Sequence, residues 1–269
     1  DRLRTAFIEV RRVRDNALVE GVDLLSGQPD RLVLCDRSLA ARDSALATLI
    51  AETGGQNAML VDNSALPEQV IRDVLISAFG SSGQRCSALR VLFVQEETAD
   101  RIMQLLAGAM EKLVIGDPRW LKTDVGPVID EAAQQALQQH INWLHQNARL
   151  IALCPLPEST QYGSYVAPHA FEIDSLDQLS KEHFGPILHV VRYASKDLDL
   201  IIDQVNRSGY GLTLGVHSRI ETTWNYIQSR VRAGNCYVNR NMIGAVVGVQ
   251  PFGGEGLSGT GPKAGGPHY

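Results

Sequence analysis

Hydrophobic and polar residues alternate in blocks along the chain from residue 49 onward. Short apolar runs typical of buried strands lie at 57–61, 89–94, 187–193, 212–218 and 236–240. Longer segments with helical periodicity lie at 67–79, 97–113, 130–148, 197–207 and 221–232. Strands that alternate with helices form parallel βαβ units. The pattern therefore predicts an α/β fold, an open, mostly parallel sheet with helices on both faces.

The two ends of the chain depart from this pattern. Near the N-terminus the periodicity is poorer, although 15–25 and 38–50 could each be helical. The tail at 251–269 is so rich in Gly and Pro that we expect a loop, either a flexible terminus or a backbone-lined binding loop. The expected organisation is a partly helical segment at 1–48, an α/β domain at 49–242 and a Gly/Pro-rich loop at 243–269.

Composition narrows the classes of partner. The chain has 269 residues, is 44% hydrophobic and carries a formal net charge of −5, with Lys and Arg scattered along it. Such a chain suits a globular protein and offers no basic surface for nucleic acid. No apolar run approaches the ~20 residues of a membrane span, and the first residues lack a signal peptide's apolar region, so we expect a cytoplasmic location. The four cysteines are widely spaced and indicate neither a metal site nor a disulfide framework: Cys35, Cys86, Cys154 and Cys236.

One cysteine lies in a segment suited to chemistry. Cys86, within "SSGQRCSALR", falls in a turn-rich stretch between a predicted helix and a predicted strand. Reactive groups of open α/β sheets usually lie in such loops. A free cysteine is more often a small buried hydrophobe, whereas a nucleophilic thiol needs a nearby cation, helix N-terminus or base. Arg85 is adjacent in sequence and could supply the charge. The residues alone leave both interpretations open.

A second candidate segment is "IAETGGQNAMLV". Glu52 lies between apolar residues and the Gly54–Gly55 pair. A carboxyl group beside buried strand residues is expected to have a raised pKa that suits a general base, although an exposed turn residue is the alternative. Paired glycines permit close backbone approach to a ligand, and they also form ordinary turns.

A third candidate segment is "SKEHFGPILHV". Glu182 and Phe184 precede a Gly-Pro turn into a predicted strand. A carboxylate can hold ribose hydroxyls, and an aromatic ring can lie against a flat heterocycle. We expect the neighbouring His183 and His189 to be surface or core histidines rather than ligands.

Together these segments resemble a known family. "ETGGQN" resembles the Glu-Gly-Gly signature of the aldehyde dehydrogenase superfamily, "GQRCS" its catalytic cysteine signature and "KEHFGPILHV" its Glu-x-Phe-Gly-Pro segment. "YVNRN" and "QPFGG" resemble its last two landmarks, in the same order and spacing, and the resemblance covers 49–269. The chain is most similar to the glutamate semialdehyde (pyrroline-5-carboxylate) dehydrogenase branch, particularly the aldehyde dehydrogenase domain of bifunctional proline utilization proteins.

The resemblance implies a mechanism. The Cys86 thiolate would attack the aldehyde carbon, with the Cys86 backbone N–H among the donors to the resulting oxyanion. Hydride would pass to NAD, and Glu52 would deprotonate the water that hydrolyses the thioester. The implied cofactor contacts, at the nicotinamide end of NAD, are Glu182, Phe184 and Gly54. The implied contacts with the substrate's α-carboxylate are Ser87 and the backbone N–H groups of Gly265 and Gly266.

The chain also departs from the family pattern. Residues 1–48 contain neither the Phe-Thr-Gly-Ser segment nor the oxyanion-binding asparagine that lie upstream in the family. We therefore expect the dinucleotide-binding half to be absent and NAD binding to be weak or absent in this chain. The resemblance further implies a parent protein with a separate FAD-dependent proline dehydrogenase domain, a homodimer, and peripheral attachment to the inner membrane.

Three classes of function stay open. The first is NAD-dependent oxidation of L-glutamate γ-semialdehyde to glutamate in proline catabolism, with a fragment that could be inactive alone. The second is a thioester hydrolase that needs no cofactor. The third is a non-catalytic module for oligomerisation or scaffolding.

Overall fold

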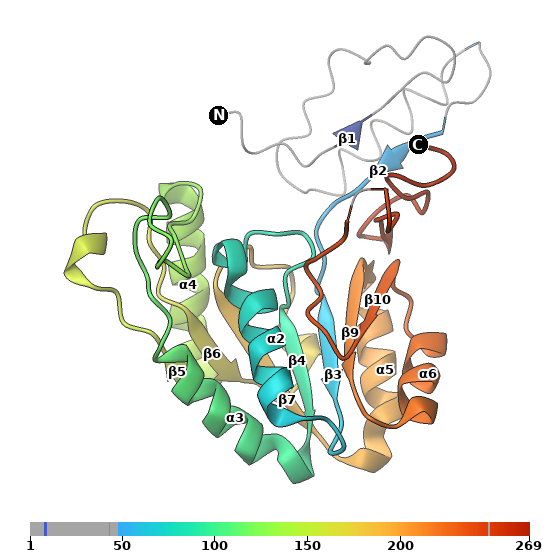
Figure 1. Ribbon diagram of the computed structural model, residues 1–269, viewed down its shortest axis with the longest axis horizontal. Helices are drawn as coiled ribbons and strands as arrows, with labels where there is room; N and C mark the ends of the chain where they lie inside the picture. Colours follow the sequence, from blue (N-terminus) through green and yellow to red (C-terminus); the bar gives the residue numbers. More distant parts are fainter. Residues whose placement is uncertain (1–7, 10–42, 44–47, 247) are drawn as a thin grey trace.

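A seven-stranded sheet forms the body of the molecule (Figure 1). The computed structural model describes residues 8–9, 43, 48–246 and 248–269. The strand order is β10-β9-β3-β4-β7-β6-β5, and only β5 runs antiparallel to its neighbour. The predicted open, mostly parallel sheet is confirmed. The strands are β3 (Ala58–Val61), β4 (Val91–Gln95), β5 (Arg149–Leu153), β6 (His169–Glu172), β7 (Ile187–Tyr193), β9 (Thr213–His217) and β10 (Asn235–Val238).

Helices cover both faces of the sheet. One apolar cluster joins the sheet to α2 and α3, and a second joins its other face to α4, α5 and α6. Alternate residues of β3 enter the two clusters, Met59 the first and Leu60 the second. Burial on both sides explains why the strands are continuous apolar runs. The helices are α2 (Pro67–Phe79), α3 (Glu96–Met110), α4 (Glu131–Asn147), α5 (Leu198–Arg207) and α6 (Glu221–Arg230).

Local sequence signals set several helix boundaries. Pro67 occupies the first position of α2, where its missing N–H costs no helical hydrogen bond. The Asp130 side chain accepts a hydrogen bond from Ala133 N at 2.7 Å and so caps α4. Two predicted elements, the helix at 67–79 and the strand at 187–193, match the structure residue for residue.

Other expectations need correction. Strands β5 and β6 were not predicted, and the helix expected at 38–50 is wrong at its described residues, because Ile50 begins strand β2 (Ile50–Ala51). Strand β2 pairs antiparallel with β1 (Ile8–Glu9). The helix expected at 15–25 lies outside the described residues.

The Gly/Pro-rich tail is hydrogen-bonded to the rest of the chain. Strand β11 (Glu255–Gly256) pairs with β8 (Tyr210–Gly211). Thr260 donates its N–H to Ala51 O at 3.1 Å and its hydroxyl to Leu49 O at 2.8 Å. Figure 1 shows the tail running beside β2. The tail is therefore a structured loop, as the binding-loop interpretation requires.

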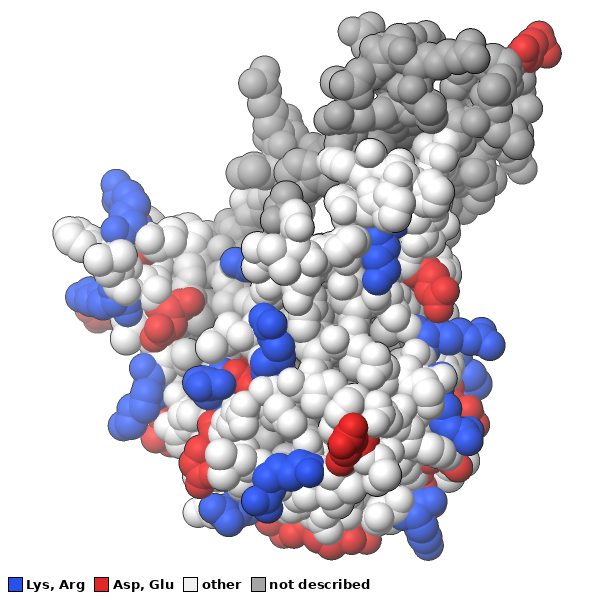
Figure 2. All heavy atoms as spheres, turned by 45° about the vertical axis from the view of Figure 1, so that its right-hand side comes forward, with Lys and Arg blue, Asp and Glu red and all other residues white. Residues whose placement is uncertain are grey.

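Charged side chains of both signs lie on the surface of the described residues. On the face shown in Figure 2, basic and acidic side chains are interspersed over the described residues. Within that part of the chain, no helix is both long and apolar enough to cross a membrane.

Candidate active site

The three candidate segments lie at the same end of three neighbouring central strands. Glu52, Cys86 and Glu182 come before β3, β4 and β7, which are neighbours in the sheet. They therefore lie at the amino ends of parallel strands. Open α/β sheets usually bind ligands at the carboxyl ends. Cys86 lies in a loop, as expected. This loop is at the amino ends of the strands, however, and not at the carboxyl ends where open α/β sheets usually bind ligands.

A left-handed turn leads into the nucleophile segment. After α2 ends, Ser81, Ser82 and Gly83 have φ values of 55°, 56° and 66°. A Cβ at Gly83 would overlap the carbonyl oxygen of Gly185. Glycine is therefore required there both by its backbone conformation and by its close approach to the Glu182 segment.

Cys86 is partly exposed, and its thiol is flanked by two carboxyl groups. Burial raises the pKa of the Cys86 thiol, and the charges of Glu182 and Glu52 raise it further. The backbone N–H groups of Ser87 and of Cys86 itself act in the opposite direction by donating hydrogen bonds to the thiolate. At neutral pH the thiol form is favoured, so the reaction needs a base to take its proton.

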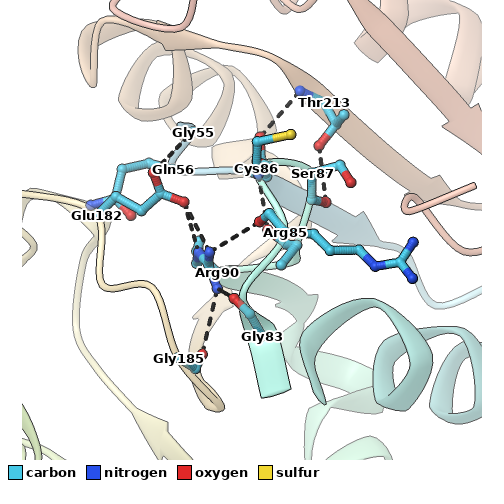
Figure 3. Close-up of polar contacts among 12 residues, drawn as sticks. Gly55, Gln56, Gly83, Arg85, Cys86, Ser87, Arg90, Glu182, Gly185 and Thr213 are labelled. Carbon is cyan, nitrogen blue, oxygen red and sulfur yellow. Dashed lines mark hydrogen bonds and ion pairs between the residues drawn. The ribbon is translucent and has the colours of Figure 1, made fainter. Parts of the chain in front are cut away.

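The guanidinium of Arg85 is bound by groups other than the Cys86 thiol. It donates to Ser81 Oγ at 2.9 Å and to Ile243 O at 3.2 Å. Figure 3 shows the guanidinium directed away from the Cys86 sulfur. Arg85 is therefore adjacent to Cys86 in sequence without placing its charge at the thiol.

The other described cysteines lie in less suitable surroundings. Cys154 is buried, and its thiol donates to Leu113 O at 3.6 Å. Burial raises the pKa of Cys236 to about 11. Cys35 lies outside the described residues.

Glu52 has the raised pKa that its sequence context predicts. Burial raises its pKa to about 7, against the opposing effects of the Gly254 N–H and Lys263. Oxygen Oε2 accepts from Gly254 N at 2.8 Å, while the buried Oε1 has no partner among the described residues. A Cβ at Gly253 would overlap Oε1, and one at Gly259 would lie 3.0 Å from Oε2. The tail glycines therefore line a carboxyl group that can exchange a proton near neutral pH.

Glu182 is held by a residue that the sequence did not indicate, Arg90. The guanidinium places both Nε and Nη2 3.0 Å from Glu182 Oε1, and Gly55 N donates to Oε2 at 2.8 Å (Figure 3). The side chains are 9% and 1% exposed for Glu182 and Arg90. Burial raises the pKa of Glu182, and Arg90 opposes the rise. A Cβ at Gly54 would overlap Glu182 Oε2, so the glycine pair lets the carboxylate approach.

Arg90 also ties the Glu182 segment to the nucleophile segment. It donates to Gly83 O at 2.6 Å and to Arg85 O at 3.2 Å. Its Cζ lies 4.8 Å from the centre of the Phe184 ring, which is 41% exposed. Phe184 therefore offers an aromatic surface next to the Glu182 carboxylate.

Asn57 is a second residue that the sequence did not indicate. Its Nδ2 donates to Cys86 O at 2.6 Å and to Ala88 O at 2.9 Å, and its Oδ1 accepts from Thr213 N at 3.1 Å. Asn57 and Arg90 share a signal in the sequence, because each is a polar residue at the start of a predicted buried strand. A buried polar group needs hydrogen-bonding partners, and here the partners belong to the site.

The substrate-binding residues expected from the resemblance lie in two places. Ser87 is buried directly after Cys86, and its carbonyl accepts from Thr213 Oγ1 at 3.4 Å. Gly265 has a φ of 71° and is exposed in the tail. Gly266 N donates to Lys263 O at 3.0 Å, so a bound carboxylate would have to replace that acceptor.

Three histidines form a cluster near Glu182, and two of them, His140 and His183, are stacked. The His140 and His183 rings are parallel, 3.4 Å apart, and His140 Nε2 lies 2.9 Å from His189 Nε2. His189 Nδ1 lies 2.9 Å from Arg90 O, which only accepts, so neutral His189 donates there and His140 donates to His189. Burial lowers the pKa of each ring, to about 4 for His140 and about 3 for His183 and His189. Among the described residues no cluster suits a metal ion, and the expected core role of His189 is confirmed.

The fold is that of an aldehyde dehydrogenase catalytic domain. The family model for the aldehyde dehydrogenase family matches residues 36–269, and the chain belongs to that family. The match begins at residue 36, earlier than residue 49, from which the resemblance was expected.

Individual relatives define the branch more narrowly. The chain is 52% identical over 259 residues to bifunctional protein PutA of Klebsiella aerogenes, covering 93% of this chain and 20% of that protein. It is 35% identical over 226 residues to 1-pyrroline-5-carboxylate dehydrogenase of Geobacillus thermodenitrificans, covering 83% of this chain and 43% of that protein. The chain thus spans about a fifth of the length of this PutA relative.

Solved structures agree. A variant of PutA from Bradyrhizobium japonicum superposes with a TM-score of 0.84 at 58% identity, covering 89% of this chain and 24% of that one. A 1-pyrroline-5-carboxylate dehydrogenase from Thermus with bound NAD superposes with a TM-score of 0.79 at 31% identity, covering 88% of this chain and 46% of that one.

Proposed function

We propose that this chain is the catalytic domain of an NAD-dependent dehydrogenase that oxidises L-glutamate γ-semialdehyde to glutamate in proline catabolism. The observation that carries the proposal is the Cys86 thiol, whose pKa is affected by the charge of Glu52, together with the pKa of about 7 of that carboxyl group. The names of the relatives, PutA and 1-pyrroline-5-carboxylate dehydrogenase, support the substrate. In this proposal, residues 49–242 form the catalytic domain and residues 243–269 form the substrate-binding loop.

The first chemical step belongs to Cys86. Its thiol loses a proton to a base, and the sulfur forms a bond to the aldehyde carbon while the carbonyl becomes an oxyanion. The backbone N–H groups of Cys86 and Ser87, which donate toward the sulfur, are suited to stabilise this developing charge. When bound, NAD supplies the acceptor for the hydride that leaves the same carbon. The product on the enzyme is a Cys86 thioester.

The second step belongs to Glu52. In its ionised form the carboxylate takes a proton from water, and the resulting hydroxide attacks the thioester carbon. The carbon–sulfur bond breaks, which releases glutamate and restores the thiolate. A pKa of about 7 leaves a substantial fraction of Glu52 ionised at neutral pH.

Two residues of the described chain fit the nicotinamide end of the cofactor. The Glu182 carboxylate is fixed by Arg90 and the Gly55 N–H, and its oxygens retain accepting capacity for ribose hydroxyls. The exposed Phe184 ring offers a flat surface beside it. Gly54 keeps the space that this carboxylate occupies.

At the far end of the substrate, Ser87 and the N–H groups of Gly265 and Gly266 are the proposed donors to the α-carboxylate. Charge-assisted hydrogen bonds of this kind replace the water that the carboxylate loses. An FAD-dependent proline dehydrogenase domain in the parent protein and a homodimeric assembly belong to the same proposal.

The test follows nicotinamide absorbance when glutamate semialdehyde and NAD are mixed with the 269-residue chain and, in parallel, with the intact protein that its gene encodes. We expect oxidation by the intact protein that Cys86→Ala abolishes. Oxidation that survives Cys86→Ala would overturn the assignment. Hydrolysis of thioesters without NAD, and no oxidation, would favour the hydrolase.

A further inference from the structure

We propose that Asn57 and Thr213 are positioning residues for the nucleophile. They bind the carbonyl groups of the segment that follows Cys86, and they thereby aim the Ser87 N–H at the Cys86 sulfur. Neither side chain is proposed to touch the substrate. The inference concerns the thiol itself and holds whichever acceptor or substrate the site uses.

Three consecutive carbonyl groups carry this inference. Asn57 Nδ2 donates to the carbonyls of Cys86, at 2.6 Å, and Ala88, at 2.9 Å, and Thr213 Oγ1 donates to the carbonyl of Ser87 between them, at 3.4 Å. Asn57, the residue before β3, and Thr213, the first residue of β9, thus bind every carbonyl of the segment 86–88. Figure 3 shows the contact between Thr213 and the Ser87 carbonyl.

Peptide geometry links these carbonyls to the sulfur. The Cys86 carbonyl and the Ser87 N–H belong to one trans, planar peptide unit, in which the two groups point in opposite directions. When Asn57 fixes the carbonyl on one side, the N–H is fixed on the other. The Ser87 N–H lowers the pKa of the Cys86 thiol, an effect that requires it to face the sulfur. Rotation of this peptide would remove the donor from the sulfur.

Asn57 can take only one orientation. Its Oδ1 accepts from Thr213 N at 3.1 Å, so its NH₂ group must face the two carbonyls. The side chain is 3% exposed, and a Cβ at Gly55 would overlap its Oδ1. Thr213 lies at the start of β9 and is also buried. The two residues therefore fix each other as well as the nucleophile segment.

A merely structural role would also explain buried hydrogen bonds, so the test needs a readout specific to the thiol. The 269-residue chain is treated with iodoacetamide over a range of pH, and modification of Cys86 is followed by mass spectrometry. Thiolate is the reactive form, so the profile gives the apparent pKa and the limiting rate separately. Thermal unfolding of each variant is measured in parallel.

We expect Asn57→Ala to raise the apparent pKa of Cys86 by about one unit, which is a roughly tenfold slower reaction at pH 7. The limiting rate at high pH should stay close to that of the parent chain. The matched control is Asn206→Ala, because the Asn206 amide likewise bridges two backbone groups, Arg230 O and Arg232 N, away from the site. That variant should lose stability and keep the Cys86 profile.

A second pair of variants covers the case in which Asn57→Ala does not fold. Thr213→Val keeps the shape and removes the hydroxyl, and we expect a rise of the same sign with a roughly twofold to threefold slower reaction at pH 7. Thr213→Ser keeps the hydroxyl and should restore the parent profile. Unmoved profiles in Asn57→Ala, or in Thr213→Val where Asn57→Ala fails to fold, would overturn the proposal, even with lowered melting temperatures.

Discussion

Glu52 and Glu182 flank the same thiol but are held in different ways. Glu182 receives a buried guanidinium and a backbone N–H, whereas Glu52 receives one N–H from a tail lined with glycine and keeps one oxygen without a partner among the described residues. Burial raises the pKa of both groups. Only at Glu182 does a buried cation offset the cost of the charge.

The different surroundings suit the two carboxyl groups to different roles, ligand binding for Glu182 and proton transfer for Glu52. A carboxylate fixed by Arg90 is suited to hold a ligand in one place, because its geometry and charge are both set. A carboxyl group with a pKa of about 7 and a free oxygen is suited to take up and release a proton. The site therefore combines one rigid and one titrating carboxyl group around Cys86.

The largest expected effect is on the rate of deacylation of Cys86, when the titrating carboxyl group is removed by Glu52→Gln. With p-nitrophenyl acetate and the 269-residue chain, acylation of Cys86 releases a burst of nitrophenolate, and deacylation sets the later rate. We expect the burst to remain and the later rate to fall by roughly 10²–10⁴-fold, the usual contribution of a general base. In the parent chain that rate should rise with pH through about 7, as Glu52 loses its proton.

The control for this experiment is Glu68→Gln, which removes an exposed carboxylate. It should leave both phases unchanged. If Glu52→Gln abolishes the burst as well, Glu52 acts at an earlier step than thioester hydrolysis.

The next largest effect is on the free energy of unfolding, when the ion pair that fixes Glu182 is broken by Arg90→Met. The change leaves Glu182 buried without its cation, which we expect to cost about 3–5 kcal/mol of stability in urea unfolding. The double variant Arg90→Met/Glu182→Gln should recover part of that loss, because no buried charge is left unpaired. The matched control is Arg101→Met, in an exposed pair with Glu68, expected to cost less than about 1 kcal/mol. Equal losses for the two arginines would contradict the assigned role of Arg90.

A smaller effect concerns the pH dependence of stability that arises from His189, in the histidine cluster near Glu182. His189 is fully buried, and burial lowers its pKa from 6.5 to about 3. The unfolded chain binds a proton below about pH 6.5 that the folded chain rejects, so stability is present above that pH and is lost as pH falls. Because the unfolded chain binds this proton, His189 alone should lower the free energy of unfolding by about 2 kcal/mol between neutral pH and pH 5.

The measurement is urea unfolding at pH 7.5 and pH 5 for the parent chain and for His189→Phe. We expect the variant to lose less stability on acidification than the parent. An equal or larger loss would show that the acid sensitivity comes from elsewhere in the chain.

The sequence predicted the fold better than the contacts within the site. Long runs with one period, such as 67–79 and 187–193, identify their elements directly. Strand β5 escaped notice because it follows α4 closely at the edge of the sheet, with much of its length exposed. Its four apolar residues, 150–153, begin only three residues beyond the end of α4, so they do not stand out from the helix as a separate element.

Within the site, the sequence indicated Cys86 and Glu52 but not Arg90 and Asn57. Their partners lie far along the chain, 92 residues away for Arg90 with Glu182 and 156 for Asn57 with Thr213. Only the order of strands in the sheet brings such pairs together. The misleading neighbour was Arg85, whose adjacency in sequence to Cys86 does not place its guanidinium at the sulfur.

The smallest expected effect compares the two carboxyl groups through the thiol they share. Both raise the pKa of Cys86, Glu182 more than Glu52. Glu52 is partly protonated at neutral pH, which weakens its effect further. Glu182→Gln should therefore speed the reaction of Cys86 with iodoacetamide at pH 7 by about threefold, half a pKa unit, and Glu52→Gln by less.

Mass spectrometry should locate the label on Cys86 before Cys154 or Cys236, because Cys154 is buried and inaccessible and burial raises the pKa of Cys236 to about 11. Cys86→Ala, which removes the labelled site, is the control. Faster labelling of either other cysteine would count against Cys86 as the nucleophile. A larger effect from Glu52→Gln than from Glu182→Gln would reverse the comparison, because the titrating carboxyl group would then carry more of the charge felt by the thiol than the one fixed by Arg90.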